Sequence, residues 1–148
     1  MKKIVKELMI ERFVKVNEAD QIYDAVAKIA ANRETTLVCV VDEQDRLKGI
    51  ITPKRVLKMV AVREFEAMRH SLFLGPGLSY ALTTAKYAKD IMNAPVSVRP
   101  EDSVEVAVGL MLDRDIYEVP VVDDKGRVMG AISYIDIISS YHDCLRRG

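Results

Sequence analysis

The chain has no excess of charge of either sign, because 22 acidic side chains balance its 22 basic ones. This balance argues against a general electrostatic attraction to nucleic acid or to an anionic membrane. The sequence also has no apolar run approaching the roughly 20 residues that span a bilayer. Lysine and glutamate return too early in the first residues for the apolar core of a signal peptide. We therefore expect a cytoplasmic protein that binds neither membrane nor nucleic acid.

Cysteine is scarce, and the motifs of common enzymes are missing. Cys39 and Cys144 are the only cysteines, and His142 near Cys144 lacks the third and fourth ligands of a zinc site. The sequence contains no phosphate-binding Gly-rich loop, no Gly-x-Ser-x-Gly elbow, and no Cys-His or Ser-His pair in a catalytic context. We therefore expect a chain that holds no metal ion and is not an enzyme.

What the chain does contain is one small unit written twice. The offset between the copies falls only from 83 residues at Met9 and Met92 to 81 at Gly49 and Gly130. Two copies that cannot bury their apolar faces alone are expected to pack on each other and to leave clefts along the seam. The recurring positions are Met9, Val16, Asp20, Ala25, Val40 to Asp42, Arg46, Gly49 and Ile51, and then Met92, Val98, Asp102, Ala107, Val121 to Asp123, Arg127, Gly130 and Ile132.

Each copy predicts the element order β-α-β-β-α. A short apolar start is followed by a stretch with apolar residues three and four apart, which is typical of a helix. The runs 37–41 and 119–122 are uniformly apolar and rich in β-branched residues, so they predict strands covered on both faces. The return strands contain Gly49 and Gly130, where the missing side chain lets a backbone or a ligand approach closely.

The fold class predicted is therefore α/β (α+β), with two pseudo-symmetric repeats packed sheet to sheet. We expect repeat 1 over 3–60, a helical insert or linker over 61–85, and repeat 2 over 86–145. Within and after the insert, the second helix should continue over 63–73, Gly75-Pro76-Gly77 should stop it, and 78–92 should form another helix. The insert either covers the module or contacts a second chain.

The ordered duplication resembles a tandem pair of CBS domains, named after cystathionine β-synthase and also called a Bateman module. The residues that carry the resemblance are Val119 to Asp123, Gly130, Ile132-Ser133 and Asp136, and it covers nearly everything except the insert. The resemblance implies a regulatory module that binds AMP, ADP, ATP or S-adenosylmethionine between its repeats. It also implies a partner protein that responds to this ligand.

The family pattern Gly-x-x-(Ser/Thr)-x-x-Asp implies roles for individual residues. The hydroxyl residue lies near phosphate, the Asp accepts hydrogen bonds from ribose hydroxyls, and the other repeat holds the base. The second copy has the whole pattern, so it implies one competent adenosine site. Its residues are Ile132, Ser133 and Asp136, with Phe13, Val14, Thr35 and Thr36 as the facing wall.

The first copy departs from the pattern. Thr52 keeps the hydroxyl, but Arg55 occupies the Asp position and has no acceptor for a ribose hydroxyl. The resemblance places Val96, Tyr117 and Glu118 on the opposite wall of this second, weaker cleft. Arg55, together with Lys54, either belongs to a solvated helix end or turns into the cleft to meet the phosphates of a nucleotide held by Asp136.

A simpler interpretation applies to the same residues. Ser133 and Asp136 have the spacing of a helix capping box, and Thr52-Pro53 is a hydroxyl N-cap followed by proline at the first helical position. If capping is their whole purpose, the chain is a structural dimerisation or protein-interaction module whose clefts have decayed.

Apolar residues on the outer helices predict a homodimer, because uncovered patches of this kind mark interfaces. These residues are Val56, Leu57, Met59 and Val60 in the first copy and Ile135, Ile137, Ile138 and Tyr141 in the second.

Overall fold

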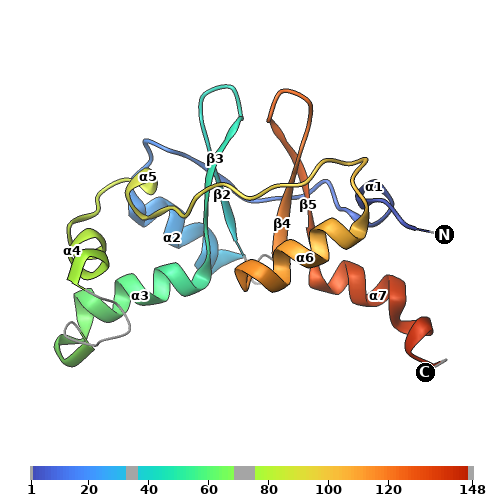
Figure 1. Ribbon diagram of the computed structural model, residues 1–148. Coiled ribbons are helices and arrows are strands. Elements are labelled where there is room, and N and C mark those ends of the chain that lie inside the picture. Colours follow the sequence, from blue (N-terminus) through green and yellow to red (C-terminus); the bar gives the residue numbers. More distant parts are fainter. Residues whose placement is uncertain (1, 33–36, 69–75, 147–148) are drawn as a thin grey trace.

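A computed structural model describes residues 2–32, 37–68 and 76–146. The two repeats have the expected order of elements and confirm the predicted fold class. Figure 1 shows hairpins β2–β3 and β4–β5 side by side, with α3, α6 and α7 along one side of them. The elements are α1 (Val5–Leu8), β1 (Lys15–Asn17), α2 (Ile22–Ala31), β2 (Val38–Val41), β3 (Leu47–Ile51), α3 (Pro53–Glu64), the 3-10 helix η1 (Glu66–Met68), α4 (Pro76–Thr84), α5 (Ala88–Ile91), α6 (Val104–Arg114), β4 (Glu118–Val122), β5 (Val128–Ser133) and α7 (Tyr134–Leu145).

The two sheets share an antiparallel hairpin, but only the sheet of repeat 1 has a full first strand. In repeat 1, β1 runs parallel to β2, and β2 pairs antiparallel with β3, giving the order β1-β2-β3. In repeat 2, β4 and β5 form the hairpin, and the first strand is reduced to a parallel bridge between Val98 and Val121.

The buried strands confirm the prediction of cover on both faces. Val38 and Val40 of β2 pack with the helices of repeat 1, whereas Cys39 and Val41 pack with Val119 and other residues of repeat 2. Successive strand residues point to opposite faces, so β2 takes part in both apolar clusters. The hairpin turns add direct bonds between the repeats: the N–H of Leu47 donates to Gly126 O at 2.9 Å, and that of Val128 to Asp45 O at 3.1 Å.

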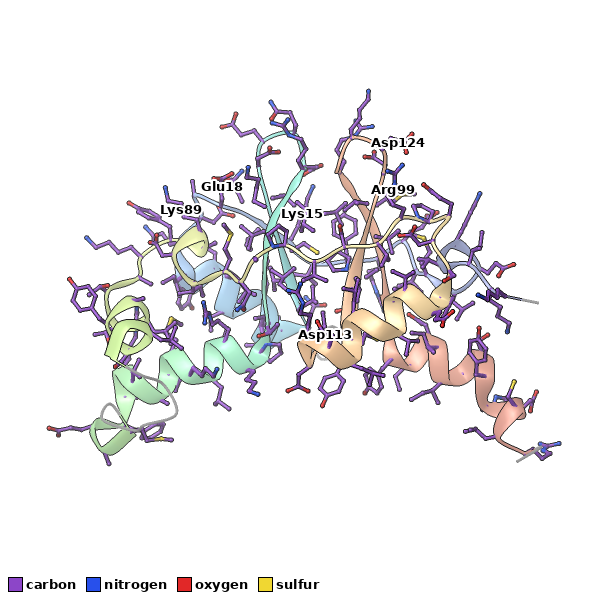
Figure 2. The ribbon with its side chains drawn as sticks, in the orientation of Figure 1. Lys15, Glu18, Lys89, Arg99, Asp113 and Asp124 are labelled. Atoms are coloured by element: carbon purple, nitrogen blue, oxygen red, sulfur yellow. The ribbon has the colours of Figure 1, made fainter. Side chains whose placement is uncertain are left out.

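Each repeat is completed by the first residues of the other repeat, 5–10 and 86–93, which we call the exchanged segments. Ile10 and Ala131 of β5 exchange two backbone hydrogen bonds of 2.9 Å, and Val5 N–H donates to Asp102 O at 2.8 Å. Symmetrically, Asn93 pairs with Ile50 of β3. The α5 segment lies beside repeat 1, as Glu18 and Lys89 show in Figure 2, and Lys89 N–H donates to Glu18 O at 3.1 Å. The sequence did not indicate this exchange.

The exchange explains the two recurring glycines. A Cβ on Gly49 would lie 2.6 Å from the carbonyl oxygen of Asn93, and a Cβ on Gly130 would overlap the carbonyl oxygen of Ile10. The close approach predicted at these positions is therefore made by backbone of the exchanged segments, with Met92 and Met9 packed beside it.

The region between the repeats differs from the prediction. Helix α3 ends at Glu64 instead of continuing over 63–73, of which residues 69–73 lie outside the described part of the chain. Pro76 begins α4 instead of marking the stop of a helix, which suits proline because its missing N–H is not needed there.

The single helix expected over 78–92 is also wrong, because it breaks between α4 and α5. The backbone at this break turns aside to bond with repeat 1, where Lys86 O accepts a hydrogen bond from Ile22 N–H at 3.1 Å. Helix α4 itself covers repeat 1: Leu82 is buried in that repeat's core, and Arg63 Nε donates to Leu82 O at 2.9 Å.

The helices proposed for the dimer interface are apolar on two sides. Val56 and Met59 are buried inside the chain, which corrects their assignment to an outer face. Leu57, Ile135 and Ile138 are more than half exposed. Among the described residues, no helix is long and apolar enough to cross a membrane.

Candidate functional site

The Gly-x-x-Ser-x-x-Asp turn of repeat 2 joins β5 to α7 and forms the predicted capping box. The hydroxyl of Ser133 accepts a hydrogen bond from Asp136 N–H at 3.3 Å. In return, Oδ2 of Asp136 accepts from Ser133 N–H at 2.8 Å and from the Ser133 hydroxyl at 3.0 Å. The other carboxylate oxygen, Oδ1, has no hydrogen bond within the described part of the chain.

Asp136 lines an open cavity of about 700 Å³ between α7 and the exchanged helix α1. Ser133 and Ile132 do not reach this cavity; Ile132 is fully buried in the core. The sequence did not predict that Lys2 and Lys3 line this cavity, because nothing in the repeat indicated that α1 packs on repeat 2. The other lining residues are Lys2, Lys3, Glu7, Leu8, Ser139 and Ser140.

The structure describes half of the wall predicted to face Asp136. Phe13 and Val14 lie just before β1, both half-buried, and Val14 O accepts a hydrogen bond from Cys39 N–H at 2.8 Å. Phe13 packs on the core cluster shared by the repeats, and Val14 on that of repeat 1. Thr35 and Thr36 lie outside the described residues.

The second cleft is a cavity of about 670 Å³ between the two repeats. It brings together Thr52, Arg55, Val96 and Tyr117, four of the five residues predicted for it. The Thr52 hydroxyl caps α3 by accepting from Arg55 N–H at 3.2 Å, as its sequence indicated. Arg55 is held by a hydrogen bond from its Nε to Ile91 O at 3.0 Å.

Glu118 is the predicted residue that does not line this cavity. It directly follows Tyr117 at the start of β4, and successive strand residues face opposite ways, so Glu118 is buried on the other side. Burial, together with the nearby charge of Glu118, raises the pKa of the Cys39 thiol to about 12.

Four cationic side chains line the second cleft, and the sequence had suggested two of them, Arg55 and Lys54. Lys58 and Arg114 join them, and Asp115 is the one carboxylate on the lining. The remaining lining residues are Ile50, Pro53, Asn93, Ala94 and Ile116. Lys58 and Arg114 were missed because one lies a turn beyond the motif and the other precedes the strand of the other repeat.

Among the described residues, no group of three or more His, Cys, Asp or Glu side chains is placed to hold a metal ion. The imidazole of His142 lies 3.1 Å from the carboxylate of its neighbour Asp143 and 3.0 Å from Ser139 O.

Comparison with known proteins identifies the repeated unit. The model of the CBS domain family matches residues 5–62 and again residues 88–143. CBSX3, a mitochondrial CBS domain-containing protein of Arabidopsis thaliana, is 32% identical over 120 residues, which are 80% of this chain and 52% of that protein. The chain thus spans about half the length of this relative.

Two solved structures show the same fold over nearly the whole chain. A CBS domain-containing protein of Thermotoga maritima superposes with a TM-score of 0.77 and 27% identity, covering 97% of this chain and 95% of that one. The cytosolic domain of the Mg²⁺ channel MgtE in complex with ATP has a TM-score of 0.67 and 25% identity, covering 93% of this chain and 48% of that one. The resemblance seen in the sequence is confirmed, and the chain belongs to the CBS domain family, as a tandem pair.

Proposed function

We propose that this chain is a cytoplasmic regulatory module that binds one adenosine-containing ligand between its repeats and signals to a partner protein. The ligand class is AMP, ADP, ATP or S-adenosylmethionine. Binding changes the shape of the module or its assembly as a homodimer, and the partner responds to that change.

The observation that carries this proposal is the carboxylate of Asp136 at the start of α7, which lines the cavity beside α1 and has one oxygen that accepts no hydrogen bond from the described residues. A carboxylate can accept hydrogen bonds from both cis hydroxyls of a ribose. Arg55 stands at the equivalent position of repeat 1 and has no acceptor, which supports one ribose site per chain. The MgtE domain solved with ATP, a relative of the same fold, supports an adenine nucleotide as the ligand.

Calorimetric titration of AMP, ADP, ATP and S-adenosylmethionine into the purified chain tests the proposal. At least one ligand should bind with a stoichiometry of one per chain, and Asp136→Ala should weaken it about tenfold to a hundredfold, as expected for a hydrogen bond to a charged group. Asp90→Ala is the matched control, because Asp90 caps α5 by accepting from Tyr87 N–H at 2.9 Å yet lines neither cleft.

A second candidate function is a structural dimerisation or protein-interaction module. The exposed side chains of Leu57, Ile135 and Ile138 favour it, and so does the use of Asp136 as a helix cap. This candidate replaces the first if none of the four ligands binds, or if Asp136→Ala binds as tightly as wild type.

A further inference from the structure

The two clefts differ in charge at positions that the repeat makes equivalent. The first turns of α3 and α7 are related by an offset of 81 residues, so Lys54 corresponds to Ile135, Arg55 to Asp136 and Lys58 to Ser139. Three cations in one repeat thus stand where the other has an apolar residue, a carboxylate and a hydroxyl.

The cleft of repeat 1 has an apolar floor and a cationic mouth. Ile50, Val96 and Ile116 are at most 8% exposed, whereas Lys54 and Arg114 are exposed and Arg55 and Lys58 are half-buried. With Asp115 as the one carboxylate, the lining carries a net charge of +3, although the whole chain carries none. Such a concentration of cations around a cavity attracts a ligand with several negative charges.

These cations make few strong contacts with other residues. Arg55 donates to Ile91 O at 3.0 Å, and Arg114 pairs with its neighbour Asp113 at 3.3 Å, where both side chains are more than half exposed. Lys58 has no hydrogen bond or ion pair within the described part of the chain. Lys54 pairs with Asp115 across the cleft at 3.4 Å, but both side chains are about 70% exposed. An exposed pair of this kind contributes little stability, so an anion can readily compete with Asp115 for Lys54.

We infer that the cleft of repeat 1 binds a polyphosphate group, without a ribose contact, and therefore distinguishes ligands by their number of phosphates. This deepens the proposed function, because it gives the second cleft of the same module its own ligand chemistry. The polyphosphate is either the tail of a nucleoside triphosphate, whose base covers the apolar floor beside Tyr117, or an inorganic chain.

Substitution of Asp115 provides a test in which polyphosphate should bind more tightly. It has a positive φ of 54° at the end of α6, and asparagine tolerates this left-handed conformation. Asp115→Asn removes the one carboxylate on the lining of the cleft with little change of shape. It should tighten the binding of inorganic tripolyphosphate about threefold to fivefold, the range for one exposed charge interaction.

The experiment is calorimetric titration of sodium tripolyphosphate, ATP and adenosine in magnesium-free buffer. Tripolyphosphate should bind wild type once per chain, with the same affinity when adenosine is saturating. Lys58→Gln should weaken it about tenfold, as for a lost charge-assisted hydrogen bond. Lys48→Gln is the control for net charge, because Lys48 is exposed on β3 and lies outside the cavity.

The outcomes separate this inference from the proposed function. Failure of tripolyphosphate to bind, or equal losses in Lys58→Gln and Lys48→Gln, overturns the polyphosphate site even if adenosine binds normally. Tripolyphosphate binding that responds to Asp115→Asn supports the site even if adenosine does not bind, and in that case it is the ribose site that fails. ATP binding more tightly than tripolyphosphate, with the same dependence on Lys58, identifies the nucleotide as the source of the phosphates.

Discussion

Ser133 and Asp136 are bound to each other by reciprocal hydrogen bonds: Ser133 N–H and hydroxyl donate to Oδ2 of Asp136 at 2.8 and 3.0 Å, and Asp136 N–H donates to the Ser133 hydroxyl oxygen at 3.3 Å. The capping and ligand-binding interpretations of this pair are compatible for the carboxylate, which has a second oxygen to offer. Capping and phosphate binding both require the hydroxyl of Ser133, so they are not compatible there. Ser133 has a single hydroxyl proton, so it must release Asp136 before it can donate to a phosphate.

Loss of the cap should destabilise the fold in a non-additive way. Ser133→Ala should lower the free energy of unfolding by about 1 kcal/mol, the usual cost of a lost N-cap. Asp136→Ala removes the other half of the same capping box, so the double variant should lose clearly less than the sum of the single losses. Urea denaturation of the four proteins measures this. Strict additivity would show that the two residues act independently.

Alanine at the recurring glycines should disrupt the exchanged segments. Gly130→Ala and Gly49→Ala place a Cβ against the backbone of Ile10 and Asn93, which cannot move without breaking its hydrogen bonds. Each should destabilise the fold by about 1 to 3 kcal/mol or more, the cost of overpacking. The matched control is Gly109→Ala in the interior of α6, where no atom lies within 4 Å of the new Cβ. It should stabilise the fold by about 0.5 to 1 kcal/mol. Thermal unfolding measures the stability of the three variants. Equal losses of stability in all three would contradict this explanation.

The sequence was most informative where one repeat could be read against the other. The duplicated pattern predicted the order of elements, the strands buried on both faces and the caps of α3 and α7, because each depends on local periodicity or spacing. The close approach at Gly49 and Gly130 was also predicted, but not the segments that make it. Which backbone packs against a glycine depends on long-range topology, and one sequence does not contain that information in any local pattern.

The candidate clefts show the same limit. Thr52, Arg55, Val96 and Tyr117 meet as expected, because the family pattern fixes their places on the elements. Glu118 faces away because strand residues alternate, and the pattern had specified a segment, not a face. Lys58 and Arg114 could not be predicted, because only the folded arrangement of α3 and α6 brings them to one cavity.

The chain should form a homodimer through α3 and α7. Leu57 is 68% exposed, and Ile135 and Ile138, three residues apart on one face of α7, are 52% and 54% exposed. Exposed apolar side chains that gather on a surface mark interaction sites. Light scattering at micromolar concentration should give twice the mass of one chain. Ile138→Glu should shift the mass toward the monomer, because it places a charge in the apolar contact. Tyr80→Glu on α4, where the side chain is 73% exposed, should leave the dimer intact. A monomeric wild type would rule out this interface.

Alkaline pH should destabilise the fold through Cys39. Its pKa rises from 9.0 to about 12 on folding, so above pH 9 the unfolded chain loses the thiol proton while the folded chain keeps it. The unfolded state then binds fewer protons, and the free energy of unfolding falls as pH rises between these two values, by about 1.4 kcal/mol per pH unit from this group.

Other groups also titrate in this range, so the contribution of Cys39 is the difference between wild type and Cys39→Ala in urea denaturation at pH 8 and pH 10. Cys39→Ala should show the shallower loss. Cys144→Ala, which removes the exposed thiol of α7, should lose stability as steeply as wild type. Equal slopes for wild type and Cys39→Ala would show that the buried thiol does not govern the alkaline limit.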